Sequence, residues 1–293
     1  MKHLTALLVV VLIAGNLSAQ EKNRLSAGDE RLYALARTDI KAFAVEVSKG
    51  ATSDINRVRA IVNWLTQNFD WKYTDYQKRT VQEVIERRGG NCDDLARVAL
   101  AAMNALNIRL RRVHEVNIQP ISDRRAANAR ALVKEKGNQY SVFGRHHNDH
   151  IWLEVYDQQT DEWFPADPWT GLVGLREWET ARVGFGKRTG IAPDAAEMIV
   201  PIAIFAADAD GNFTIDRTRH YLVDEFDRLY DGKLHELPAW KQWVAAIDRV
   251  DPEVGGAFAG KVNLHDFEAN IDAAAGDYER LRAEYLPINR KKS

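Results

Sequence analysis

Gly89-Gly90-Asn91-Cys92-Asp93-Asp94 is the stretch that decides the fold, because it leads directly into a nearly continuous apolar segment at 95–106. A helix that is apolar on almost every side belongs in the middle of a core. Cys92 would then begin a buried helix, where unpaired backbone N–H groups and the positive end of the helix dipole favour a thiolate. The same N–H groups could bind the oxyanion that forms when a thiolate attacks a carbonyl carbon.

Cys92 is the single cysteine among 293 residues, so no disulfide can form within the chain. Three interpretations of its thiol remain open: an intermolecular disulfide, a buried inert thiol, or a reactive nucleophile. Asp93 and Asp94 suit the first turn of a helix, but their charges oppose ionisation of a neighbouring thiol. A nucleophilic Cys92 would therefore need a nearby positive group, such as an imidazolium.

His150 and Asp167 are the candidate partners of that thiol. His150 precedes a predicted strand at 151–156, and Asp167 ends the next predicted strand after a turn at 157–162. Two antiparallel strands joined by a hairpin place the start of the first beside the end of the second. The carboxylate would then fix the tautomer of the imidazole and stabilise its charged form, as in a nucleophile–base–carboxylate triad.

Two other uses of these residues stay open. His146 and His150 are four residues apart and could form a zinc site with Cys92 as a further ligand. Asp149 could compete with Asp167 as the partner of the imidazole. We expect no metal and no cofactor, because a thiol, an imidazole and a carboxylate suffice for acyl transfer.

The composition excludes several broad classes of protein. Hydrophobic residues make up 45% of the chain and charged residues 28%, which argues against wholesale disorder and against a multi-span membrane protein. The formal net charge of −2 creates no overall field toward nucleic acid or an anionic membrane. Nucleic acid is therefore not an expected partner.

Residues 1–19 have the layout of a secretory signal peptide. Lys2 and His3 form a short positive start, an uncharged apolar run follows at 7–14, and a cleavage site is expected before Gln20. The apolar run is short for a membrane-spanning helix, and the alternative is an uncleaved N-terminal anchor. We therefore expect an exported protein, periplasmic or secreted, without stable membrane insertion once the signal is removed.

The order of the predicted elements gives an α+β fold class, in which helices precede antiparallel strands and a mainly helical C-terminal part follows. The predicted helices are 26–48, 54–69, a short helix between the capping box of Thr80 and Glu83 and the stop at Gly89-Gly90, 95–106, and most of 222–285. The predicted strands are 108–116, 140–143, 151–156 and 163–167, with a polar, basic insertion at 117–138.

Two features of the C-terminal part have simple structural interpretations. The segment 208–212 is similar to a calcium loop but lacks carboxylates at the first and last ligand positions, so an ordinary turn is expected. Trp178, Trp240 and Trp243 are expected to pack in the core.

Three blocks of sequence together resemble the transglutaminase-like superfamily. They are Gly90-Asn91-Cys92-Asp93-Asp94, His150-Ile151-Trp152-Leu153-Glu154-Val155-Tyr156 and Trp163-Phe164-Pro165-Ala166-Asp167-Pro168, and they occur in family order within residues 54–170. The resemblance implies a papain-like α+β core, with helices packed on an antiparallel sheet. In it Cys92 is the nucleophile, His150 the general base and acid, and Asp167 the residue that orients the imidazole. It places the transglutaminase-like core at 20–171 and leaves 172–293 as a mainly helical extension.

Together with the predicted signal peptide, this resemblance implies an exported, thiol-dependent acyl-transfer enzyme that acts on amide bonds, as a peptidase or amidase or as a protein cross-linker. Its expected partner is a protein or peptide substrate, including a cell-envelope peptide. Tyr73 and Tyr76 are candidates for completing the oxyanion hole, and Tyr73, Tyr76 and Trp152 are candidates for contacting substrate. The alternative is a catalytically inactive domain of the same fold that binds a cell-envelope peptide or glycan.

Overall fold

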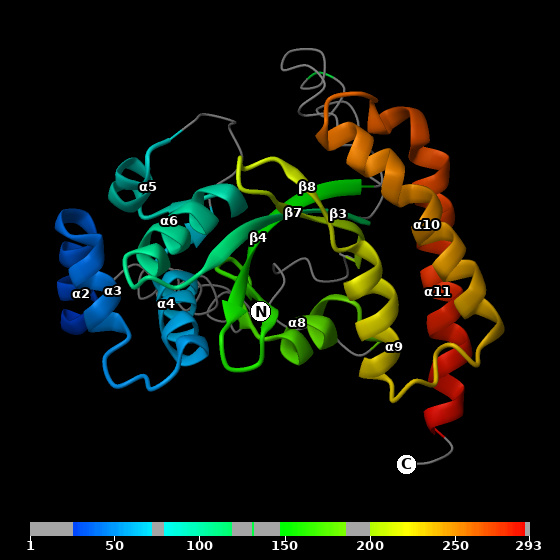
Figure 1. Cartoon of the computed structure of the whole chain (residues 1–293), viewed down its shortest axis with the longest axis horizontal. Helices are drawn as coiled ribbons and strands as arrows, with labels where there is room; N and C mark the ends of the chain where they lie inside the picture. Colours follow the sequence, from blue (N-terminus) through cyan, green and yellow to red (C-terminus); the bar gives the residue numbers. More distant parts are fainter. Residues whose placement is uncertain (1–25, 72–78, 119–130, 132–146, 186–199, 291–293) are drawn as a thin grey trace, which may run out of the picture.

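A six-stranded antiparallel sheet forms the centre of the molecule (Figure 1). The computed structural model describes residues 26–71, 79–118, 131, 147–185 and 200–290. The strand order is β6-β5-β4-β3-β7-β8. These strands are β3 (Leu110–Ile118), β4 (His147–Asp157), β5 (Glu162–Asp167), β6 (Leu172–Val173), β7 (Val200–Ala207) and β8 (Phe213–Asp216). A separate parallel pair joins β1 (Asp70–Trp71) to β2 (Gly89–Gly90).

Helices from the N-terminal part cover one face of this sheet (Figure 1). They are α2 (Ala27–Thr38), α3 (Ile40–Val47), α4 (Asp54–Asn68), α5 (Val81–Arg87) and α6 (Cys92–Asn104). The helix predicted over 26–48 is interrupted at Asp39, which has an extended backbone and whose carboxylate accepts a hydrogen bond from the amide of Ala42. Asp39 therefore ends α2 and caps α3. The predicted capping box of Thr80 and Glu83 is confirmed at the start of α5.

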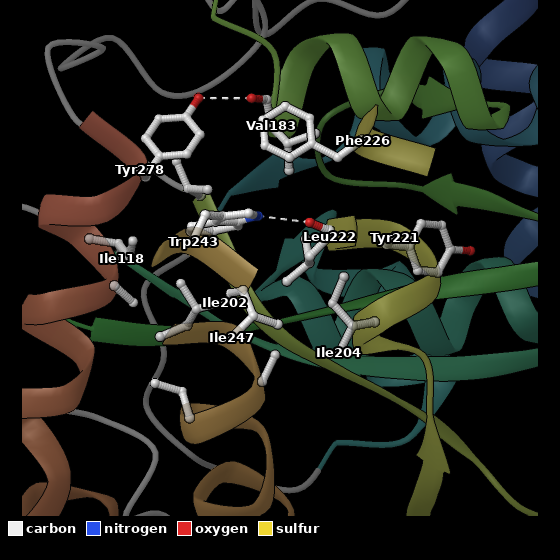
Figure 2. Packing of buried hydrophobic residues seen from close by; sticks show 14 of the residues in the cluster. Ile118, Val183, Ile202, Ile204, Tyr221, Leu222, Phe226, Trp243, Ile247 and Tyr278 are labelled. Carbon is white, nitrogen blue, oxygen red and sulfur yellow. Dashed lines mark hydrogen bonds between the residues drawn. The ribbon is translucent and has the colours of Figure 1, made fainter. Parts of the chain in front are cut away.

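Helices from the C-terminal part cover the other face (Figure 1). They are α8 (Leu175–Arg182), a π-helix η2 (His220–Glu225), α9 (Phe226–Leu229), α10 (Pro238–Phe258), a 3₁₀-helix η3 (Leu264–Phe267) and α11 (Glu268–Arg290). Figure 2 shows two hydrogen bonds that fix this layer. The indole N–H of Trp243 donates to the carbonyl of Leu222 at 2.8 Å, and the hydroxyl of Tyr278 donates to the carbonyl of Val183 at 2.8 Å.

The sheet separates two hydrophobic cores, because alternate residues of a strand point to opposite faces. On β4, Trp152 belongs to the C-terminal core, whereas Ile151 and Leu153 belong to the N-terminal core. The predicted core packing of three tryptophans is confirmed, since all of them are buried in the C-terminal core: Trp178, Trp240 and Trp243.

Strand β7 joins the C-terminal part of the chain to the central sheet. It pairs with β3 from Val113↔Ala206 to Ile118↔Val200, and every residue of β7 is buried. On the opposite edge, β6 pairs with β5. The predicted boundary at residue 171 therefore cuts through one continuous sheet. Described residues on both sides of residue 171 contribute strands to this sheet.

The hairpin between β7 and β8 contains the turn at 208–212. The carboxylate of Asp208 accepts hydrogen bonds from the amides of Asp210 and Asn212 at 3.0 and 2.9 Å. It also accepts one from the hydroxyl of Thr214 at 2.6 Å. These bonds form an ordinary turn in which an aspartate side chain binds the following backbone, as the sequence predicts.

Candidate active site

Cys92 is the first residue of α6, which packs in the middle of the N-terminal core. The side chain of Asn91 accepts a hydrogen bond from the amide of Asp94 at 2.9 Å, and the carboxylate of Asp94 accepts one from the amide of Asn91 at 3.3 Å. This capping box satisfies the amides of Asn91 and Asp94. The amides of Cys92 and Asp93 also lie in the first turn, where an α-helix supplies no backbone acceptor for its N–H groups. The local sequence thus places a cysteine among backbone N–H groups.

The two glycines before Cys92 are required by close backbone contacts. A Cβ on Gly90 would lie 2.4 Å from the Cβ of Asp94. A Cβ on Gly89 would lie 2.2 Å from the backbone oxygen of Asp70, because β2 pairs with β1 at that point. Gly89 also has a φ of +150°, which side chains rarely allow. The glycines therefore let the chain pass closely enough to deliver Cys92 to the helix start.

His150 on β4 and Asp167 at the end of β5 lie side by side, and the thiol of Cys92 completes the cluster. Nε2 of His150 lies 2.7 Å from Oδ2 of Asp167. The thiol of Cys92 forms a hydrogen bond with the ring of His150. Since Nε2 of that ring faces Asp167, Nδ1 is the nitrogen left for this bond. The thiol also accepts a hydrogen bond from the backbone N–H of Ile151. His150 and Asp167 are buried, whereas Cys92 is partly exposed. The three predicted residues therefore form one contiguous site.

Opposite charges shift the pKa of both members of the His150–Asp167 pair. Burial alone would lower the pKa of His150, but the charge of Asp167 and the hydrogen bond to it outweigh burial and raise that pKa to about 10. Burial alone would raise the pKa of Asp167, but the charge of His150, the hydrogen bond to it and the charge of Arg182 lower that pKa to about 2. The pair is therefore an imidazolium and a carboxylate at neutral pH.

The pKa of the Cys92 thiol is raised above its ordinary value. Burial is the largest cause, and it outweighs the hydrogen bond and the positive charge of His150, while the charge of Asp149 adds to the rise. The sequence predicts that the helix start favours the thiolate. In the folded chain, burial of the sulfur opposes this effect, whereas His150 and the amide of Ile151 favour the thiolate.

Asp149 does not compete with Asp167 for the imidazole of His150. Its Oδ2 lies 2.7 Å from Nε2 of His114, on the neighbouring strand β3. The ring of His114 stacks on Phe258 with ring centroids 4.1 Å apart, which fixes its position. Asp149 therefore belongs to a second histidine–carboxylate pair beside the site.

Three residues around the triad escape prediction from the sequence. Glu115 is the cross-strand neighbour of His150 and is fully buried. The ring of Trp169 packs edge-on against the ring of His150, with centroids 5.3 Å apart. Arg182 is fully buried, and its Nη1 lies 3.8 Å from Oδ2 of Asp167. The one signal in the sequence is the spacing of Trp178 and Arg182, which puts both on the same face of a helix.

The predicted substrate-contact residues have different outcomes. Trp152 is completely buried in the C-terminal core, and its indole N–H donates to Oε2 of Glu115 at 2.9 Å. The prediction that Trp152 contacts substrate is therefore wrong, because no part of its ring reaches solvent. Tyr73 and Tyr76 lie outside the described residues.

The predicted zinc alternative involves His146, which also lies outside the described residues. Among the residues that the structure describes, no group of three or more His, Cys, Asp or Glu side chains is arranged to hold a metal ion. In the same part of the chain, no helix is both long and apolar enough to span a membrane.

A cavity of about 610 Å³ lies where α4, β6 and α8 meet. Its lining includes Arg59 and Glu177, whose side chains form an ion pair at 2.8 Å, but no residue of the triad. This cavity is therefore separate from the candidate site.

Comparison with protein families gives a match to the transglutaminase-like superfamily over residues 41–168, a region that contains Cys92, His150 and Asp167. No match was found among the curated proteins. Two similar solved structures are titled "Crystal structure of Rad4-Rad23 bound to a 6-4 photoproduct UV lesion" and "Crystal structure of Rad4-Rad23 crosslinked to an undamaged DNA". The first is 13% identical with a TM-score of 0.34, over 95% of this chain and 57% of that chain. The second is 12% identical with a TM-score of 0.34, over 94% and 57%.

The present chain thus spans less than two thirds of the length of those two chains, and the DNA in the titles belongs to those proteins. The family match agrees with the helices packed on an antiparallel sheet and with the element order described above. Residues 41–168 of this chain therefore match the transglutaminase-like superfamily, the family that the three sequence blocks resemble.

Proposed function

We propose that the chain is an exported, thiol-dependent acyl-transfer enzyme that acts on amide bonds. Cys92 is the nucleophile, His150 the general base and acid, and Asp167 the carboxylate that orients the imidazole. The supporting observation is that the thiol contacts a buried imidazole whose other nitrogen is 2.7 Å from a buried carboxylate. Apolar packing gives no reason to bury such groups, since burying them is costly unless they are paired, and a chemical role accounts for their position.

Attack requires a thiolate beside an imidazolium, so the reactive form has lost one proton relative to the resting thiol–imidazolium pair. The sulfur bonds to the carbonyl carbon, and the C=O π electrons move to the oxygen, to which the amides of Cys92 and Asp93 donate hydrogen bonds. His150 then gives its proton to the amide nitrogen, the C–N bond breaks, and an amine leaves the thioester on Cys92. Water or a second amine attacks this thioester and gives its proton to His150. The C–S bond then breaks, the acid or the new amide is released, and the thiolate of Cys92 is restored beside the imidazolium.

We favour hydrolysis over cross-linking, because water is always present, whereas an amine acceptor needs a binding site that the described residues do not identify. The proposed substrate is a protein or peptide, such as a cell-envelope peptide. The steps above need no cofactor and no nucleic acid. Incubation of a peptide mixture with the wild type and with Cys92→Ala, followed by mass spectrometry, distinguishes new chain ends from new cross-links.

One observation favours a second candidate, a catalytically inactive domain that binds a cell-envelope peptide or glycan. Burial raises the pKa of Cys92 and so disfavours the thiolate in the free protein. An enzyme must offset this effect when substrate binds or at alkaline pH. A binding domain has no such need.

Alkylation of Cys92 by iodoacetamide, measured as a rate across the pH range by intact-protein mass, separates the two candidates. The hydrogen bond and charge of His150 lower the pKa of the thiol. We therefore expect His150→Ala to slow alkylation at mildly alkaline pH, because less of the thiol is then ionised. His235→Ala is the matched control, because the side chain of His235 is 59% exposed and pairs with Asp227 in the C-terminal part. Equal rates in the wild type and His150→Ala would support the binding domain.

We also propose that residues 1–19 direct export. Protein expressed with its own N-terminus and recovered outside the cytoplasm should begin at Gln20 when sequenced from its N-terminus. A protein that stays in the cytoplasm and keeps Met1 would contradict this part of the proposal without affecting the triad.

A further inference from the structure

Arg182 is the last residue of α8, and its side chain is completely buried in the C-terminal core. It shares the inner face of α8 with Trp178, whose ring centroid lies 5.8 Å from the guanidinium carbon. A buried guanidinium is strongly unfavourable unless carboxylates lie close enough to compensate for the lost hydration. The function of Arg182 is therefore to be sought in the carboxylates that surround its guanidinium group.

Two fully buried carboxylates face this guanidinium. Nη2 donates a hydrogen bond to Oε1 of Glu115, and Nη1 lies 3.8 Å from Oδ2 of Asp167. Oδ2 is also the oxygen that contacts Nε2 of His150 at 2.7 Å. Within the part of the chain that the structure describes, Nη1 has no hydrogen-bond partner. One edge of the guanidinium is therefore anchored on Glu115, and the other presents its charge to the oxygen that holds the imidazole.

Both carboxylates are fixed in place by other donors. Oδ1 of Asp167 accepts the amides of Trp169 and Thr170 at 3.0 and 3.3 Å. Glu115 accepts the indole N–H of Trp152 at 2.9 Å and the side-chain amide of Asn117 at 3.2 Å. Because neither carboxylate is free to turn away, Arg182 is held at a constant position relative to the triad.

We propose that Arg182 is a positioning residue for the triad, which holds Oδ2 of Asp167 as a charged oxygen directed at His150. Its catalytic meaning rests on the proposed function of Cys92, His150 and Asp167. Arg182 lies beyond the matched region at 41–168, so the C-terminal part of the chain completes the site.

The physical consequence concerns the protonation of Asp167. The charged groups that face this carboxylate are His150 from β4 and Arg182 from α8, with Glu115 from β3 behind the guanidinium and Cys92 from α6 behind the imidazole. Loss of Arg182 removes a cation that opposes the effect of burial, so Asp167 takes up a proton more readily. A protonated Asp167 no longer stabilises the imidazolium.

The test is the titration of the Asp167 carboxyl carbon by NMR in ¹³C-aspartate-labelled protein, with the signal assigned from Asp167→Asn. In the wild type, Asp167 should stay ionised down to the acid limit of folding. In Arg182→Met, its midpoint should rise by about one pH unit, equal to a tenfold change in proton affinity. Arg182→Lys keeps the charge and should restore most of the wild-type behaviour. Arg176→Met, on the exposed side of the same helix, is the matched control and should change nothing.

A structural role limited to neutralising Glu115 predicts a different result. Arg182→Met would then lower stability without moving the Asp167 titration, and this result would overturn the proposal. The double variant Glu115→Gln, Arg182→Met removes the carboxylate that the single variant leaves unpaired, so it provides a folded protein if the single variant fails to fold. The Asp167 titration should be raised in it as well, and a wild-type titration there would also overturn the proposal.

The failure of this inference and the failure of the proposed function have separate signatures. Alkylation of Cys92 that does not depend on His150 contradicts the enzyme. Asp167 titration that does not depend on Arg182 contradicts the positioning role, whether or not the chain is an enzyme.

Discussion

Replacement of Asp167 by Asn removes the charge of the carboxylate but keeps its size and one oxygen. The oxygen can still accept the amides of Trp169 and Thr170. The substitution therefore isolates the electrostatic part of the His150–Asp167 interaction. We expect a loss of folding stability whose size depends on pH in a way that identifies His150 as its source.

The pKa values give the magnitude of the loss. The rise for His150 from 6.5 to about 10 corresponds to about 5 kcal/mol, and the fall for Asp167 from 3.8 to about 2 corresponds to about 2.5 kcal/mol. The value from Asp167, about 2.5 kcal/mol, describes the His150–Asp167 pair better. The pKa of His150 is also raised by its hydrogen bond to Cys92 and by the charge of Cys92, which are not part of this pair. We expect Asp167→Asn to lower the free energy of unfolding by about 2–5 kcal/mol at mildly acidic pH.

The sign of the pH dependence follows from linkage. The pKa of His150 is raised on folding, so its contribution is complete below pH 6.5 and is lost as the pH rises from 6.5 to about 10. The pKa of Asp167 is lowered on folding, so its contribution is present above pH 3.8 and is lost as the pH falls toward about 2. Without the carboxylate, burial keeps His150 neutral in the folded variant. The free energy of unfolding of the wild type minus that of Asp167→Asn should therefore decrease by about 1.4 kcal/mol for each pH unit above 6.5.

Urea unfolding followed by tryptophan fluorescence measures this difference at a series of pH values. Groups that titrate equally in both proteins cancel in the comparison. Asp231→Asn is the control, since the side chain of Asp231 is 82% exposed and its loss should leave the pH dependence unchanged. A wild-type-to-variant difference that stays constant from mildly acidic to alkaline pH would refute the assignment of an imidazolium to His150.

Three further predictions concern the helix start and a buried carboxyl group. Asn91→Ala removes the N-cap of α6 and should lower the free energy of unfolding by about 1 kcal/mol in urea denaturation, whereas an unchanged midpoint would contradict the capping role. Gly90→Ala places a Cβ against Asp94 and should cost about 1–3 kcal/mol, measured in the same way; a smaller cost than that of Gly276→Ala, a helical position with no atom within 4 Å, would be inconsistent with the contact. Glu179 is buried, and its carboxyl oxygens have no hydrogen-bond partner among the described residues. Burial raises its pKa well above 4.5, so the wild type loses stability from this group as the pH rises above 4.5. Glu179→Gln should raise the melting temperature at mildly alkaline pH but not below pH 4.5, and calorimetry that finds equal shifts at both would disprove this explanation.

Local rules account for the parts of the fold that the sequence predicts well. The capping box of Thr80 and Glu83 and the glycines at 89 and 90 act over a few residues, so neighbouring letters suffice to recognise them. The strand pair that carries His150 and Asp167 is also local, because its hairpin is short. The break at Asp39 was missed, since the apolar spacing continues across it while the aspartate caps a new helix.

Contacts between distant parts of the chain explain what sequence patterns miss. Strand β7 reaches β3 across more than 80 residues, and no local pattern specifies that partner. The alternation of residues along β4 puts Trp152 on the opposite face from Ile151 and Leu153, as the sequence pattern predicts. The sequence pattern does not show that helices from the C-terminal part of the chain cover that face. Trp152 is therefore a core residue and not a substrate contact, although it lies close to His150 in the sequence.

The amino-acid sequence by itself determined where the thiol, the imidazole and the carboxylate stand on their helix and strands, because capping, glycine contacts and hairpin pairing are short-range. The tertiary structure alone decided their protonation and their surroundings. Desolvation raises the pKa of Cys92, His114 takes Asp149 as its partner, and Arg182 arrives from α8 to face Asp167. Each of these three features depends on which side chains are buried next to one another. Those contacts form only when the helices of both cores pack on the sheet and exclude water.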